Sequence, residues 1–220
     1  MLNLNLVGVD EAGRGAIAGP LVVASFLDCR FYPDYIKDSK KIKEVNREEI
    51  FNIFLEKRFN FGVGVVSNEY IDKYGISKAL KEGVYLSLNF IFGKESFLFN
   101  ESFLKNYDFR KNYSLYYPEI NKFNGNLLIL IDGNTPIIKE YKTIAIINGD
   151  DRIPIISSAS IVAKVVRDRI MRTLCNKFKG YDFSINKGYC TEEHLKSLEK
   201  FGISICHRKT FLKNFSKIFN

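Results

Sequence analysis

Two adjacent acidic residues at the end of an apolar run are the most informative feature of this chain. Asp10 and Glu11 follow the run Leu4–Val9 and precede a turn in which Arg14 lies between two glycines. Successive side chains of a strand point to opposite faces, so both carboxylates reach one metal centre only where the strand ends or kinks, and the glycines permit this. The guanidinium of Arg14 can bind a phosphate through two hydrogen bonds. The segment therefore combines metal ligands with a phosphate-binding element, or it is a solvated turn whose acids cap a helix.

Two further acidic residues also follow apolar, strand-like runs. Asp132 follows Leu127–Ile131, and Asp150 lies just beyond Thr143–Ile147. In α/β sheets, binding sites form beyond the carboxyl ends of the strands, so acids from three strand ends can meet at one edge. Ordinary turn chemistry is the alternative, because Asp beside Gly favours turns. The combination with Asp10 favours a shared acidic site.

The composition limits both the metal and the partner. The 220 residues are 46% hydrophobic and carry a formal net charge of +8. An excess of positive charge favours an anionic partner, above all nucleic acid, and a merely basic surface is the alternative. The chain has only two histidines, and its four cysteines do not match a zinc-binding spacing. A metal site should therefore use oxygen ligands, which suit Mg²⁺ or Mn²⁺.

The sequence carries no signal for a membrane or for secretion. No apolar stretch approaches the roughly 20 residues that span a bilayer. The residues MLNLNLVGVD have neither the basic region nor the cleavage site of a signal peptide. We therefore expect a cytoplasmic protein with free thiols, and a monomer is the simplest expectation.

The distribution of apolar residues predicts an α/β domain with a mixed sheet. The expected strands are Leu4–Val9, Leu21–Leu27, Phe61–Val66, Leu127–Ile131 and Thr143–Ile147, and the expected helices are Val45–Lys57, Asn68–Tyr74, Ser77–Phe92, Ser157–Lys177 and one from near Thr191. Ser157 or Ser158 is expected to cap the long helix. Residues 93–126 lack clear periodicity and are interpreted as an insertion or long connection. Their aromatic and basic residues either stack on a single nucleic-acid strand, or pack on the domain or stay partly disordered.

Several ordered motifs together resemble one known family, ribonuclease HII, the type 2 ribonuclease H of bacteria and archaea. The motifs are Val9–Pro20, Asp38–Lys41, Ile131–Asn134, Gly149–Asp168, Lys187–Thr191, His194 and His207–Phe211. The resemblance implies a ribonuclease H-like fold, with a mixed five-stranded sheet flanked by helices and a C-terminal helical extension. It places a catalytic domain at residues 1–180 and a substrate-contacting helical segment at residues 181–220.

The resemblance also implies the residues of the site. The catalytic, metal-binding carboxylates would be Asp10, Glu11, Asp132 and Asp150. In this family the backbone of the glycine–arginine–glycine turn reads the 2′-hydroxyl of the substrate, a role that falls on Gly13, Arg14 and Gly15, and a tyrosine that senses the substrate corresponds to Tyr189. Further candidates for substrate contact are Ser39, Lys40, Lys164 and Lys187, and the alternative for the lysines is an ordinary solvated or helix-packed side chain. His207 and Arg208 are either structural or in contact with DNA.

The implied activity is an endonuclease that cuts the RNA strand of RNA–DNA hybrids and cuts duplex DNA on the 5′ side of single ribonucleotides. Two divalent cations about 4 Å apart, Mg²⁺ or Mn²⁺, would activate water and neutralise the leaving oxygen. One alternative is ribonuclease HIII, which shares the fold but would carry a glycine–lysine–glycine element and an N-terminal appendage. Another is a catalytically inactive module that binds hybrids. Arg14, Tyr189 and the four retained acids favour ribonuclease HII.

Overall fold

The five expected strands all form, and they make up the centre of one sheet. The computed structural model describes residues 4–28, 32, 42–89, 97–98, 100–117 and 126–213. The five strands are β1 (Leu4–Ala12), β2 (Leu21–Leu27), β3 (Phe61–Val66), β6 (Asn126–Asp132) and β7 (Lys142–Ile146). β1 is antiparallel to β2 and parallel to β6, and β6 is parallel to β7. The carboxyl ends of β1, β6 and β7 therefore lie at the same edge of the sheet.

Within the described residues the sheet has seven strands, not the expected five, because part of residues 93–126 joins it. β5 (Tyr113–Tyr117) pairs antiparallel with β3, and β4 (Phe97–Leu98) pairs with β5, which gives the order β4-β5-β3-β2-β1-β6-β7. Without β5, the backbone of β3 would lie at an edge with unpaired polar groups, and β5 satisfies them. Helix α4 (Glu101–Asn106) precedes β5, and Tyr107 and Leu115 are fully buried. The expectation that aromatic residues of this segment pack on the domain is confirmed for Tyr107.

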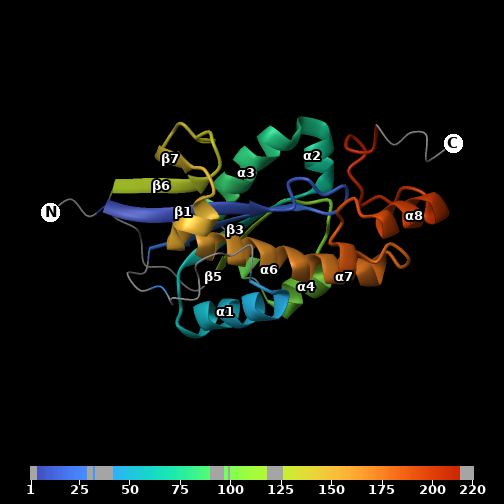
Figure 1. The fold of residues 1–220 in the computed structure, drawn as a ribbon, viewed down its shortest axis with the longest axis horizontal. Coiled ribbons are helices and arrows are strands. Elements are labelled where there is room, and N and C mark those ends of the chain that lie inside the picture. Colours follow the sequence, from blue (N-terminus) through green and yellow to red (C-terminus); the bar gives the residue numbers. More distant parts are fainter. Residues whose placement is uncertain are drawn as a thin grey trace.

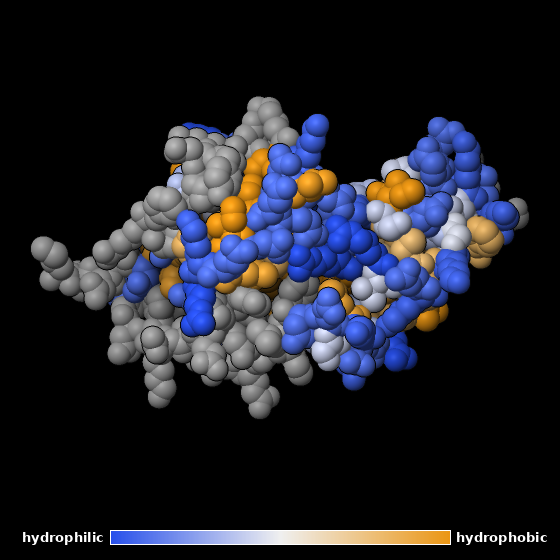
Figure 2. Space-filling model, turned by 90° about the horizontal axis from the view of Figure 1, so that it is seen from below, coloured by the Kyte–Doolittle hydropathy of each residue, from blue (hydrophilic) through white to orange (hydrophobic). Residues whose placement is uncertain are grey.

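Helices cover both faces of the sheet (Figure 1). α1 (Glu44–Glu56) and α6 (Pro154–Lys177) lie on one face, and α2 (Asn68–Tyr74) and α3 (Ile76–Leu88) lie on the other. The short helices α5 (Gly149–Arg152) and α7 (Phe183–Asn186) flank α6 in sequence, and α8 (Glu192–Phe201) lies at the far end of the molecule. Seen from the side of α1, the described surface is mostly hydrophilic, with a few hydrophobic areas (Figure 2). Among the helices that the structure describes, none combines the length and hydropathy needed to cross a membrane.

The start of α6 lies against β1, next to the candidate acids. Gly8 makes this approach possible, because a Cβ atom there would lie 2.3 Å from a backbone oxygen of α6. The expected capping by a serine is wrong, because α6 begins at Pro154, a residue favoured in the first turn, where its missing N–H is no loss. Ser157 instead donates a hydrogen bond to the carbonyl of Asp150, and Ser158 donates to the carbonyl of Pro154. The hydroxyl of Ser157 thus ties α6 to α5.

Candidate active site

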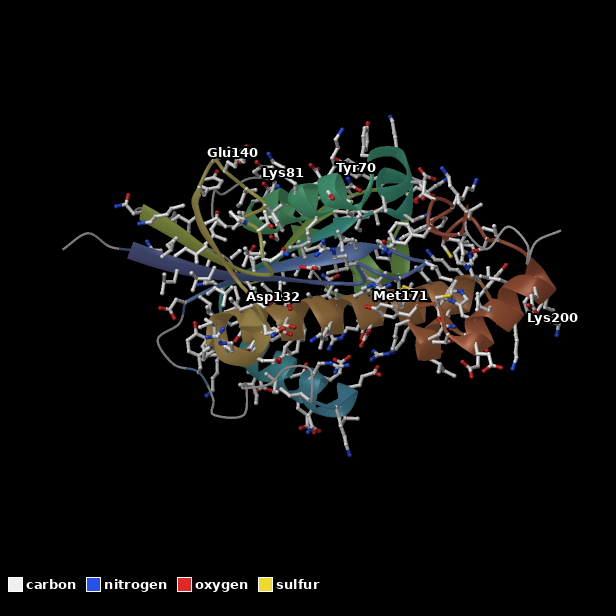
Figure 3. All side chains as sticks on the ribbon, turned by 45° about the horizontal axis from the view of Figure 1, so that its top comes forward. Tyr70, Lys81, Asp132, Glu140, Met171 and Lys200 are labelled. Atoms are coloured by element: carbon white, nitrogen blue, oxygen red, sulfur yellow. The ribbon has the colours of Figure 1, made fainter. Side chains whose placement is uncertain are left out.

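The four candidate carboxylates come from neighbouring strand ends and one short helix. β1 and β6 are parallel neighbours with Val9 opposite Ile131, so Asp10 and Asp132 occupy the next positions on adjacent strands. Asp150 lies in α5, between β7 and α6. The exposed fractions of Asp10 and Asp150 are only 5% and 2%. Asp132 lies beside the first turns of α6 (Figure 3).

Hydrogen bonds hold these acids at the strand ends. The amide of Glu11 donates to Oδ1 of Asp10 at 2.7 Å, and the amide of Gly149 donates to Oδ1 of Asp132 at 2.7 Å. The second bond joins the end of β6 to the start of α5. Glu11 also forms an ion pair with the exposed guanidinium of Arg14, at 3.6 Å. Asp10 is therefore linked to Glu11, Asp132 to α5, and Glu11 to the turn that follows β1.

Burial, with repulsion from neighbouring carboxylates, raises the pKa values of Asp10 and Glu11. Burial raises the pKa of Asp10 to about 8, the negative charges of Glu11 and Asp132 add to this, and the hydroxyl of Ser160 acts in the opposite direction. Burial also raises the pKa of Glu11, with repulsion from Asp132 and Asp150 adding to it and Arg14 opposing it. All four carboxylates therefore belong to one electrostatic cluster.

This cluster fits a divalent cation by its chemistry, although the side chains do not form a closed ligand set as they stand. Among the described residues, no three His, Cys, Asp or Glu side chains form a group that could hold a metal ion. The donors are all carboxylate oxygens, as Mg²⁺ and Mn²⁺ prefer, and cations would relieve their repulsion. The hydroxyl of Ser160 lies close enough to Asp10 to lower its pKa, but burial and the neighbouring acids still raise it. Carboxylates that raise the pKa of a neighbour in this way agree with a site completed by cations.

The glycine–arginine–glycine turn follows the acids and is held from behind by a buried arginine. β1 ends at Ala12, and Gly13 then adopts a φ of +86°, which favours glycine. Nη1 of Arg208 donates to the carbonyls of Gly13 and Arg14, at 2.8 and 3.2 Å. Arg14 and Gly15 are exposed. The turn therefore presents its outer side to solvent while its carbonyl groups face the protein interior.

A cleft of about 440 Å³ opens beside this turn and Asp132. Its walls include Arg14 together with Lys78 and Lys81 of α3. Lys81 also pairs with Glu140 at 3.2 Å, and both lie on the α3 side of the sheet (Figure 3). Positive walls next to an acidic cluster suit a polyanionic strand that must approach bound cations.

Tyr189 lies in a loop whose carbonyl groups are hydrogen-bonded one after another. Its ring is 42% exposed and lies 5.2 Å from the guanidinium of Arg167. The carbonyl of Lys187 accepts from Arg167 at 2.8 Å, and that of Gly188 accepts from two amides of the loop after β1, at 2.8 and 3.1 Å. The carbonyl of Tyr189 accepts from Nδ1 of His194 at 2.8 Å. The loop is therefore fixed from three directions while the ring stays accessible.

The two histidines continue this chain of hydrogen bonds into the core. Nε2 of His194 lies 3.0 Å from Nε2 of His207, whose Nδ1 accepts from the amide of Ser204 at 3.1 Å. Because His194 donates through Nδ1, its Nε2 must accept from His207, so both rings are neutral. Burial, and then repulsion from His194, lowers the pKa of His207 to about 4, and burial lowers the pKa of His194. His207 and Arg208 are buried, which makes them structural in the free protein.

Comparison with known proteins then decides the family. The family model described as Ribonuclease HII matches residues 7–89 and 122–214. The chain belongs to the ribonuclease HII family. A ribonuclease HII of Campylobacter jejuni is 36% identical over 212 residues, covering 95% of this chain and 91% of that protein, and one of Acetivibrio thermocellus is 34% identical over 211 residues, covering 96% and 70%. The chain is therefore a ribonuclease H hydrolase.

A solved structure agrees with the fold of this ribonuclease HII. The structure of the PCNA:RNase HII complex from Archaeoglobus fulgidus matches with a TM-score of 0.66 and 24% identity, and covers 98% of this chain and 97% of that chain. The ribonuclease HII family model leaves residues 90–121 unmatched. This gap contains β4, α4 and β5, the elements that extend the sheet beyond the expected five strands.

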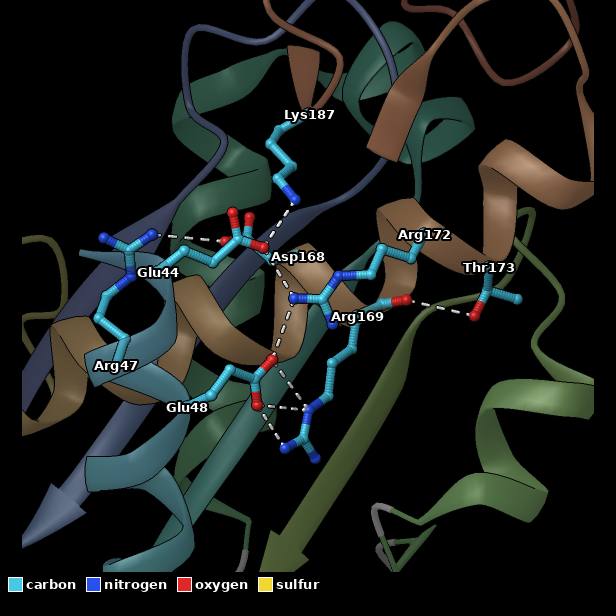
Figure 4. Close-up of polar contacts among 8 residues, drawn as sticks. All are labelled: Glu44, Arg47, Glu48, Asp168, Arg169, Arg172, Thr173 and Lys187. Atoms are coloured by element: carbon cyan, nitrogen blue, oxygen red, sulfur yellow. Dashed lines mark hydrogen bonds and ion pairs between the residues drawn. The ribbon is translucent and has the colours of Figure 1, made fainter. Parts of the chain in front are cut away.

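Of the remaining residues that are predicted to contact the substrate, the structure describes Lys187 and Lys164. Nζ of Lys187 forms an ion pair with Glu44 of α1 at 3.0 Å, within a network of ion pairs between α1 and α6 (Figure 4). A phosphate bound to Lys187 would therefore compete with Glu44. Lys164 is half-buried in α6 and has interactions of its own. Ser39 and Lys40 lie outside the described residues.

Sequence analysis missed one buried residue of this ribonuclease HII that organises both loops. Arg167 is only 1% exposed and donates to the carbonyls of Ala18, Pro20 and Lys187, at 3.2, 3.0 and 2.8 Å. It thereby connects the loop after β1 with the Tyr189 loop. A charged residue on the apolar face of a long helix was the available signal, because arginine is rarely fully buried without partners.

Proposed function

We propose that this ribonuclease HII cuts the RNA strand of RNA–DNA hybrids and also cuts duplex DNA on the 5′ side of single embedded ribonucleotides. The products would carry 3′-hydroxyl and 5′-phosphate ends. The observation that supports this best is the cluster of four interacting carboxylates beside an exposed glycine–arginine–glycine turn. The acids can hold divalent cations, and the turn can recognise a sugar hydroxyl through its backbone.

The proposed roles follow from these positions. Asp10, Glu11, Asp132 and Asp150 would hold two Mg²⁺ or Mn²⁺ ions, which when bound activate a water molecule and neutralise the leaving oxygen. Because their side chains are largely shielded from solvent, the negative charge of these acids would act on bound cations with little screening.

The neighbouring loops would select the substrate. The backbone of Gly13–Gly15 would contact the 2′-hydroxyl, the group that distinguishes RNA from DNA at a given sugar. The ring of Tyr189 would pack on the deoxyribose that follows the ribonucleotide. Lys187 and Lys164 would bind phosphates, with Lys187 exchanging Glu44 for the substrate. One chain supplies all of these groups, so a monomer suffices, and residues 181–220 would be the substrate-contacting segment.

Three duplexes of one sequence test the proposal: a duplex with a single ribonucleotide, a continuous hybrid and an all-DNA duplex. With Mg²⁺, the wild type should cut the first two and leave the third intact. Asp132→Asn should lower turnover by orders of magnitude but bind the hybrid normally in EDTA, because affinity comes mainly from contacts to phosphates.

Each other result has a distinct meaning. Cleavage of the continuous hybrid alone would indicate an activity of the ribonuclease HIII kind. Hybrid binding without cleavage by the wild type would indicate an inactive binding module. Near-normal turnover by Asp132→Asn would refute the assignment of the acids.

A further inference from the structure

The contacts of Arg208 determine which way the peptide groups of the Gly13–Gly15 turn point. A trans peptide is planar, with its C=O and N–H directed oppositely. Arg208 donates to the carbonyls of Gly13 and Arg14, so the amides of Arg14 and Gly15 point away from it. Arg14 and Gly15 are exposed, which directs both amides towards the outer side of the turn. Successive outward N–H groups form a concave site for an oxygen atom.

The burial of the Arg208 charge costs free energy, and a role in packing alone does not explain this cost. Its side chain is 0% exposed, and its described hydrogen bonds all go to neutral carbonyls, including that of Gly19 at 3.0 Å. Burying a charge is unfavourable, and the attraction of Asp72 offsets only part of this cost, because the pKa of Arg208 is still lowered. Nη2 is buried without a hydrogen-bond partner among the described residues. Burial, and then repulsion from Arg167, lowers the pKa of Arg208 to about 9, so the group still carries its charge at neutral pH.

Arg208 is also fixed in place relative to the turn by backbone contacts. Its own amide donates to the carbonyl of Ile17 at 2.8 Å, and the amide of Gly19 donates to the carbonyl of Cys206 at 2.9 Å. The C-terminal segment therefore pairs with the loop after β1 at residues 206–208. These backbone contacts fix the position from which its guanidinium reaches the turn.

We propose that Arg208 is a positioning residue for 2′-hydroxyl recognition. It holds the carbonyls of the turn inward and thereby presents the amides of Arg14 and Gly15 to the sugar hydroxyl. The assignment rests on the proposed function. A planar guanidinium can bind several carbonyls from one position, whereas a single ammonium cannot reproduce this geometry. Lysine at position 208 should therefore keep the charge but lose the orientation of the turn.

The test compares Arg208→Lys with the wild type and with Arg58→Lys, the same substitution at an exposed residue just after α1. Binding is measured in EDTA on a duplex with one ribonucleotide and on the all-DNA duplex. Arg208→Lys should reduce the ratio of the two dissociation constants by about tenfold, the worth of roughly one hydrogen bond. Its affinity for the all-DNA duplex should stay unchanged, as should both affinities of Arg58→Lys.

A second readout needs no substrate. The amide NMR signals of Arg14 and Gly15 should shift in Arg208→Lys and stay in place in Arg58→Lys. If Arg208→Lys does not melt cooperatively, Arg208→Gln replaces it, because this variant removes the buried charge together with its hydrogen bonds. Unchanged amide signals, or an unchanged ratio of dissociation constants, would overturn the role of Arg208. A wild type that binds both duplexes equally would instead refute the proposed function, while the NMR comparison would still test Arg208.

Discussion

Replacing Asp10 by asparagine should stabilise the metal-free protein although it removes a candidate catalytic group. Folding raises the pKa of Asp10 from 3.8 to about 8, through burial and the nearby charges of Glu11 and Asp132. The folded state therefore binds a proton that the unfolded chain releases, and stability falls as the pH rises from 3.8 towards 8. At about 1.4 kcal/mol per pH unit, the carboxyl lowers the free energy of unfolding by at most about 4 kcal/mol at pH 7 and about 2 kcal/mol at pH 5. Asparagine cannot ionise and avoids this cost.

The assay is urea and thermal unfolding in EDTA at pH 5 and pH 7. Asp10→Asn should exceed the wild type in both conditions, with the larger difference at pH 7, where the melting temperature should rise by up to about 10 °C. Asp182→Asn is the matched control, because Asp182 is exposed and its substitution should change neither value. Mg²⁺ should then stabilise the wild type more than Asp10→Asn. If the free energy of unfolding of Asp10→Asn exceeds that of the wild type by the same amount at pH 5 and pH 7, the reasoning is refuted. Such a result would show that folding does not raise the pKa of Asp10.

Three further predictions concern other parts of the molecule. Tyr189→Ala should lose more activity on a single embedded ribonucleotide than on a continuous hybrid. Tyr189→Phe should keep most of both activities, because stacking of about 1–3 kcal/mol needs only the ring. Equal losses on the two substrates in steady-state assays would show that Tyr189 does not sense the junction. Folding lowers the pKa of His207 from 6.5 to about 4. The neutral ring should therefore contribute at most about 3 kcal/mol to the free energy of unfolding above pH 6.5, and this contribution should be lost as the pH falls towards 4. Urea unfolding of His207→Gln should show a weaker pH dependence over that interval, and an unchanged slope would contradict the neutral histidine pair. Tyr107→Phe should leave the protein as stable or more stable, because the buried hydroxyl has no partner among the described residues. Tyr107→Ala should cost about 3–5 kcal/mol in the same assay, and a smaller loss would place residues 100–117 outside the cooperative core.

The central strands and the acids were predictable because each is encoded within a short window. Apolar runs that end at Asp132 or near Asp150 mark strands by themselves, and the chain order then brings their carboxyl ends together. The extra strand β5 was missed because it is defined by its pairing with β3, which no local sequence pattern indicates. The start of α6 was misplaced by three residues, because serines at 157 and 158 suggested a cap whereas Pro154 occupies the first turn.

The buried polar network was not predictable for a different physical reason. The partners of Arg167 and Arg208 are backbone carbonyls of a loop about 150 to 195 positions away in the chain. Every residue has a backbone carbonyl, so the type of the accepting residue does not reveal the contact in the sequence. Only the folded arrangement shows that His194 and His207 serve the Tyr189 loop and not a metal.

The acids and the arginines of this site are stabilised in opposite ways, and under the proposed function this difference would separate binding from catalysis. The charges of Arg167 and Arg208 are already met by carbonyls of the folded chain, so the turn and the Tyr189 loop are in place before any ligand arrives. The charge of Glu11 is met by Arg14, which is exposed, and repulsion between neighbouring carboxylates still raises the pKa of Asp10 and of Glu11. The elements that recognise the substrate should therefore be organised without metal, whereas the carboxylates become fully ionised together only when divalent cations join them. Metal ions in this protein should accordingly govern turnover far more than they govern the choice of substrate.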